Sequence, residues 1–98
     1  MLGDLYFELG EEQRKAKRYR AAFKHFSRGV EINAQHDGLL NGLLQLEKVA
    51  AALVQEGAQL VSQGQVHDAR RKLELARDIT KKGRDSHEAA EAQLRKLD

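Results

Sequence analysis

Apolar residues recur three and four positions apart along nearly the whole chain, which is the spacing of amphipathic helices. The pattern predicts five helices, over about residues 2–17, 19–33, 38–63, 66–82 and 86–97. Short polar segments separate them, so neighbouring helices should run antiparallel. No run of alternating β-branched residues predicts a strand. The expected fold class is all-α.

Turn-forming residues support these boundaries. Gly64 can take the left-handed conformation that ends a helix, and we expect it to close the helix over 38–63. Asp85 or Ser86 can cap the start of the last helix. In that helix, the charged residues Glu88, Glu91, Arg95 and Lys96 are expected to face water.

The composition fits one small domain over residues 1–98, with 41% hydrophobic residues and neither proline nor cysteine. The chain starts without a basic segment followed by an apolar one, so we expect no signal peptide. The most apolar region, residues 39–61, is interrupted by charges and amides and should not span a membrane. These features favour a cytoplasmic or other intracellular location.

The sequence also repeats itself at a distance of 47 residues. This shift pairs Gly10 with Gly57, Tyr19 with Val66, Ala22 with Ala69, Phe26 with Leu73, Gly29 with Ala76, and Ile32 with Ile79. Small residues pair with small ones and large apolar residues with large ones. Packed helices require this, because one helix needs small residues where another crosses it and the other fills the groove.

The paired positions resemble the tetratricopeptide repeat family. The residues that carry the likeness are Tyr6, Leu9 and Gly10 at the family's aromatic and Leu-Gly positions, then Tyr19, Ala22, Phe26 and Gly29, and in the second unit Gly57, Leu60, Gly64, Val66, Ala69, Leu73 and Ala76. The resemblance implies two helical hairpins, over about 2–34 and 38–82, and a closing helix over about 86–97. The repeat is atypical, because 47 residues exceed the family period of about 34. Residues 48–98 bear a weaker resemblance to microtubule-interacting-and-trafficking domains, which are three-helix bundles.

The tetratricopeptide resemblance implies a non-catalytic interaction or scaffolding module that binds a peptide or helix of another protein. In the family, the first helix of each repeat lines the groove. The matching residues in the second unit are Ala51, Val54, Gln55, Ala58, Val61 and Ser62, and those in the first unit include Phe7, Glu11 and Arg14. The alternative is that these residues pack against neighbouring helices.

Side chains capable of catalysis or metal binding are too scattered to predict an enzyme. The four histidines are too far apart for the i, i+3 or i, i+4 pairs that bind a metal on one helix face. His36, His67 and His87 fall near predicted turns, where we expect exposed positions. We expect no catalytic residues, cofactor or metal.

Charge is unevenly distributed although the net charge is only +2. Residues 14–28 contain seven bases and no acid, and residues 70–84 are also rich in bases. Tyr19, Phe23 and Phe26 interrupt the first stretch, which suggests a nucleic-acid-binding helical bundle as an alternative function. These aromatic residues share one helical stripe, which core packing explains equally well. We therefore expect a protein partner rather than a nucleic acid.

The helix predicted over 38–63 has apolar residues on more than one face. A single neighbouring helix cannot cover all of them, and helical repeats bury their cores against one another. This feature predicts either a homodimer formed through this helix or a place in a longer solenoid.

Overall fold

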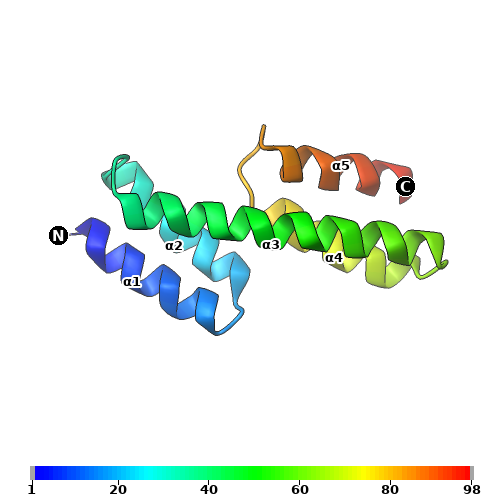
Figure 1. Cartoon of the computed structure of the whole chain (residues 1–98), viewed down its shortest axis with the longest axis horizontal. Helices are drawn as coiled ribbons and strands as arrows, with labels where there is room; N and C mark the ends of the chain where they lie inside the picture. Colours follow the sequence, from blue (N-terminus) through cyan, green and yellow to red (C-terminus); the bar gives the residue numbers. More distant parts are fainter. Residues whose placement is uncertain (1, 98) are drawn as a thin grey trace. The chain divides into compact units, whose positions relative to one another are not determined.

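The computed structural model describes residues 2–97, which form five α-helices and no strand (Figure 1). The helices are α1 (Leu2–Lys15), α2 (Tyr19–Ile32), α3 (Asp37–Ser62), α4 (Val66–Asp78) and α5 (Asp85–Leu97). The prediction of an all-α fold with about five helices is confirmed.

Most of the predicted boundaries agree with the structure to within two residues, but α4 ends four residues early. It ends at Asp78 rather than residue 82. The hydroxyl of Thr80 donates to the Ala76 carbonyl oxygen at 2.7 Å and so takes the place of a backbone donor. Gly64 has φ +79, which confirms the predicted left-handed helix end. The Glu88 backbone N–H donates to the Arg84 carbonyl oxygen at 3.0 Å, so Arg84 holds the cap position of α5 rather than Asp85 or Ser86.

The chain divides into two compact units, Met1–Leu46 and Glu47–Asp98. The division falls within α3, which Figure 1 shows as one continuous helix. Each unit therefore consists of three helical segments. The first comprises α1, α2 and the beginning of α3, and the second comprises the end of α3, α4 and α5.

Phe26 of α2 fills the core of the first unit. It is fully buried, and glycines on two other helices approach its ring. A Cβ atom added to Gly10 of α1 would overlap the ring, and one added to Gly42 of α3 would lie 2.7 Å from its Cζ atom. The missing side chains therefore make the space that Phe26 occupies.

Leu73 of α4 takes the equivalent place in the second unit and is also fully buried. A Cβ atom added to Gly57 of α3 would lie 2.7 Å from its Cγ atom. Gly10 with Phe26 and Gly57 with Leu73 thus form the same kind of contact 47 residues apart. This agrees with the pairing of small and large residues in the sequence.

The turns before α2 and α4 also correspond. Lys17 has φ 61 where its counterpart Gly64 has φ +79. The next residues, Arg18 and Gln65, have φ/ψ of −93/73 and −91/67. The first unit therefore places a lysine in a left-handed conformation that favours glycine.

The third helical segment of each unit follows a shift of 48 residues rather than 47. Its buried residues are Leu39, Gly42 and Leu46 in the first unit, and His87, Ala90 and Leu94 in the second. The extra residue goes with a difference at the end of the preceding helix. Ile32 is 51% exposed there, whereas Ile79 is fully buried. Pairing Ile32 with Ile79 on the sequence repeat is therefore not matched by their environments.

Candidate functional site

The six residues expected to bind a partner in the second unit all lie on the C-terminal half of α3. We call this set the α3 stripe, which comprises Ala51, Val54, Gln55, Ala58, Val61 and Ser62. The spacings of three and four residues place them along one side of the helix. Three members are exposed and three are half-buried: Ala51, Gln55 and Ser62 are exposed, and Val54, Ala58 and Val61 are half-buried. The stripe contains no charged side chain.

The corresponding residues of the first unit make contacts within that unit. Phe7 lies against the ring of His36, with 5.7 Å between the ring centroids. Glu11 and Arg14 form a two-pronged ion pair, in which the Arg14 Nε and Nη2 atoms each donate to a Glu11 oxygen at 2.8 Å. All three residues are half-buried. Glu11 and Arg14 thus contact each other within α1, and Phe7 contacts His36, the residue just before α3.

The ion pair of Glu11 with Arg14 changes the titration of both groups. Hydrogen bonds from the Arg14 guanidinium hold the pKa of Glu11 below its ordinary value of 4.5. The same hydrogen bonds raise the pKa of Arg14 above its ordinary value. The pair is therefore fully ionised at neutral pH.

His36 joins α1 to the start of α3 within the first unit. Its Nδ1 atom accepts a hydrogen bond from the Leu39 backbone N–H at 3.2 Å, in the first turn of α3. Its Nε2 atom therefore carries the proton and donates to Asp4 Oδ1 at 2.7 Å. This hydrogen bond lowers the pKa of Asp4 below its ordinary value of 3.8. His36 thus caps α3 through its imidazole ring.

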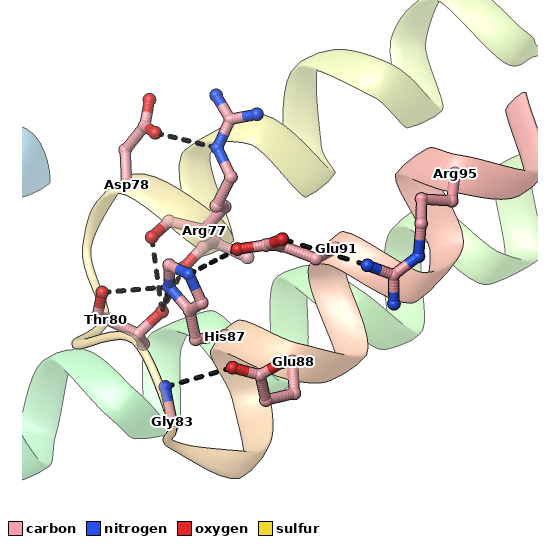
Figure 2. Close-up of polar contacts among 9 residues, drawn as sticks. Arg77, Asp78, Thr80, Gly83, His87, Glu88, Glu91 and Arg95 are labelled. Carbon is pink, nitrogen blue, oxygen red and sulfur yellow. Dashed lines mark hydrogen bonds and ion pairs between the residues drawn. The ribbon is translucent and has the colours of Figure 1, made fainter. Parts of the chain in front are cut away.

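A second polar cluster forms at the turn from α4 to α5, and Figure 2 shows His87 at its centre. The His87 Nδ1 atom lies 3.1 Å from the Thr80 carbonyl oxygen. Its Nε2 atom lies 2.7 Å from Glu91 Oε1. Both ring nitrogens therefore face oxygen acceptors. The Gly83 N–H donates to Glu88 Oε1 at 3.0 Å, which fastens the same turn (Figure 2).

Sequence reasoning placed His87 and Glu91 wrongly. His87 is buried rather than exposed, and Glu91 is half-buried against it instead of facing water. The i, i+4 spacing of the two residues was a local signal for their contact. The burial of His87 depends on the length of the turn at 79–84, which helical periodicity does not reveal. His36 is half-buried, and only His67 of the three is exposed.

Two leucines on the N-terminal half of α3 are exposed to solvent. Leu40 is 43% exposed and Leu44 is 46% exposed, and they lie one helical turn apart. Leu39 and Leu46 on the same helix are fully buried. The prediction that this helix is apolar on more than one face is therefore correct for its first half.

The described residues 2–97 contain no group of three or more histidine, aspartate or glutamate side chains arranged to hold a metal ion. None of the helices in this part of the chain combines the length and apolarity that crossing a membrane requires. Comparisons of the chain with protein-family models, with curated proteins and with solved structures give no match.

Proposed function

We propose that the chain is a non-catalytic protein-interaction module of tetratricopeptide type, which binds a peptide or helix of a partner along the α3 stripe. The absence of charge from the stripe carries the proposal, because 33% of the residues in the chain are charged. Covering the stripe removes no ion from water, so docking avoids the largest desolvation cost. The small side chains Ala51 and Ala58 allow a partner backbone to approach closely.

The helical architecture supports this proposal. Consecutive helices within each unit run in opposite directions (Figure 1), as in helical-repeat binding modules. The second unit, Glu47–Asp98, differs by one residue from the segment that resembles microtubule-interacting-and-trafficking domains. That resemblance also implies a three-helix module that binds peptides, so both likenesses favour the same class of function.

Adjacent alanines on α3 provide a direct test with a matched control. Ala51 belongs to the stripe, whereas Ala52 is also exposed but lies about 100° further round the helix. Peptides would first be selected from a random library on the full chain and their affinities measured by fluorescence anisotropy. We expect Ala51→Arg to weaken binding about tenfold, because it places an ion in the interface, and Ala52→Arg to change it less than about twofold.

Equal effects of the two substitutions would contradict a binding site on the α3 stripe. So would peptides that bind equally well to the wild-type chain and to Ala51→Arg. Circular dichroism of both variants would establish that each remains helical, since arginine has a high helix propensity.

Self-association is a second candidate function, favoured by the exposure of Leu40 and Leu44. We propose that a second copy of the chain covers these leucines, because burying both removes apolar surface from water. Light scattering at several concentrations should show a dimer that resists high salt, and Leu40→Lys with Leu44→Lys should make it monomeric. A wild-type chain that is monomeric at every concentration would exclude this candidate. The alternative to a dimer is that a neighbouring repeat of a longer solenoid covers Leu40 and Leu44.

A further inference from the structure

The outward side of α2 carries an unusual concentration of positive charge. Lys24 and Arg28 are exposed on consecutive turns, about 6 Å apart along the helix axis. Arg20 is exposed one turn before Lys24, and Lys17 and Arg18 are exposed just ahead of the helix. We call these five residues the α2 basic face.

Most of this positive charge has no ion-pair partner among the described residues. Across residues 2–97, neither Lys24 nor Arg28 forms an ion pair, and the same holds for Lys17 and Arg18. Arg20 does have an interaction of its own and is not counted with them. Lys24 and Arg28 are also like charges at i, i+4, which repel each other within the helix.

Some bases of the second unit form ion pairs with acids. Lys72 pairs with Glu56 at 2.9 Å, and Arg77 pairs with its neighbour Asp78 at 3.1 Å. Arg84 donates to Glu47 at 2.8 Å. Bases in a fold of this kind can therefore be paired with nearby acids. Among the described residues, Lys24 and Arg28 form no such pair, so both can meet the acids of a partner.

The order of charges along α2 also opposes the helix dipole. The other four helices each have an acid in the first turn, where the dipole favours negative charge. In α2 the first turn contains no acid but holds Arg20, and Glu31 lies next to the last residue. Charges placed against the helix dipole lower helix stability, and such conflicts are expected at functional surfaces.

The aromatic residues near these bases are not available to stack on nucleic-acid bases. Phe26 is fully buried, and Tyr19 and Phe23 pack against the same core. Glu8 and Glu12 of α1, the helix that packs on α2, are exposed and would repel a long polyanion. A short acidic segment confined to α2 avoids both difficulties.

We propose that the α2 basic face docks an acidic helical segment of a partner protein. Carboxylates one turn apart on such a segment have the same axial spacing as Lys24 and Arg28, so two ion pairs can form together. This surface is distinct from the α3 stripe, and its occupation does not depend on the function proposed for that stripe.

The test measures binding of a fluorescent alanine-based helical peptide of about 20 residues with glutamate at every fourth position. The full chain is compared with Lys24→Gln/Arg28→Gln and with the control Lys81→Gln/Lys82→Gln, which neutralises two exposed bases of the α4–α5 turn. We expect the first variant to weaken binding about tenfold and the control less than about twofold, because only the first removes the docking pair. Binding should also weaken with added salt.

Equal losses in the two variants would overturn the proposal, because binding would then follow net charge alone. A duplex DNA probe is measured in parallel. Tighter binding of the duplex than of the peptide, lost in Lys24→Gln/Arg28→Gln, would replace the acidic protein segment with a nucleic acid. Ala51→Arg should leave binding of the acidic peptide unchanged, so that failure at the α3 stripe is distinguished from failure at α2.

Discussion

The two units use the same arrangement of helices but fill it with residues of different size. In the first unit, Phe26 lies against Gly10 and Gly42. In the second, the smaller Leu73 lies against Gly57, and Ala90 occupies the position of Gly42. A smaller central residue thus accompanies a larger neighbouring one. The helix crossings therefore depend on the combined volume of these side chains rather than on their identities.

The units also differ in how their surfaces are charged. The second unit pairs several of its bases with acids, and its α3 stripe is free of charge. The first unit leaves Lys24 and Arg28 without ion pairs among the described residues, and it exposes Leu40 and Leu44. Similar scaffolds therefore carry surfaces of different chemistry.

Exchanging residues between the two cores tests the volume argument with the largest expected effect. Gly42→Ala places a Cβ atom 2.7 Å from the Phe26 ring, and the ring cannot retreat because Gly10 lies against it as well. We expect a loss of about 2–3 kcal/mol in the free energy of unfolding, measured by urea denaturation, after the gain in helix propensity.

Adding Phe26→Leu to this variant copies the combination of Leu73 and Ala90. Phe26→Leu alone should cost about 1–2 kcal/mol because it leaves a cavity. The double variant should lose at least about 1 kcal/mol less than the sum of the single losses. Simple additivity would contradict compensation by volume.

His87 distinguishes the second unit from the first, where Leu39 occupies the matching position. His87→Ala removes a buried side chain and leaves Thr80 and Glu91 without their partner. We expect unfolding to become easier by about 2 kcal/mol. His67→Ala, at an exposed position of α4, should change stability by less than about 0.5 kcal/mol. Similar losses in the two variants would mean that the cluster does not stabilise the turn.

His36 performs a different task in the first unit, where it caps α3 and binds Asp4. His36→Ala leaves the Leu39 N–H without its acceptor and should cost about 1 kcal/mol by thermal denaturation. His36→Asn keeps a side-chain acceptor that can cap the helix and should recover part of the loss. No difference between alanine and asparagine would argue against the capping role.

Acid should destabilise the first unit through Asp4 and Glu11. The pKa of each is lower in the folded chain than its ordinary value, through His36 and Arg14 respectively. The unfolded chain therefore binds more protons in this range. The stability from both groups is complete above about pH 5 and is lost as pH falls through the folded pKa values.

Removing these two acids should flatten that dependence. Asp4→Asn with Glu11→Gln should show a smaller loss of stability between about pH 5 and pH 2 than the wild-type chain, measured by denaturation at each pH. Glu12→Gln removes a charge from an exposed position of the same helix and serves as the control. An unchanged slope in the double variant would show that the two pairs do not contribute.

The smallest expected effect concerns the α2 basic face. Lys24→Gln with Arg28→Gln removes repulsion between like charges one turn apart, so stability should rise by a few tenths of a kcal/mol, roughly 1–2 °C in melting temperature. The control Lys81→Gln/Lys82→Gln lies outside a helix and should not show this gain. Loss of stability on neutralising α2 would mean that these bases support the fold.

Much of the fold was predictable because the information is local. Periodicity placed the helices, and the 47-residue shift related the contact of Gly10 with Phe26 to that of Gly57 with Leu73. The left-handed turn at Gly64 was also readable, since glycine favours that conformation. Its counterpart at Lys17 could not be predicted, because lysine has no preference for the left-handed conformation.

The rest depends on contacts between segments. The early end of α4 follows from the side chain of Thr80, and the burial of His87 follows from the longer turn that shifts the last helix by one residue. The α3 stripe could be listed from sequence because it lies on one helix. Which of its residues are exposed required the packing of the second unit.

The most direct test of the proposed binding function is a chemical-shift titration of the isotope-labelled full chain with a peptide selected on it. We predict that the largest shifts will fall on the backbone amides of Ala51, Gln55, Ala58 and Ser62, with little change at Ala52 or in α1. Shifts concentrated on α2 or α1, with the α3 stripe unaffected, would contradict the account.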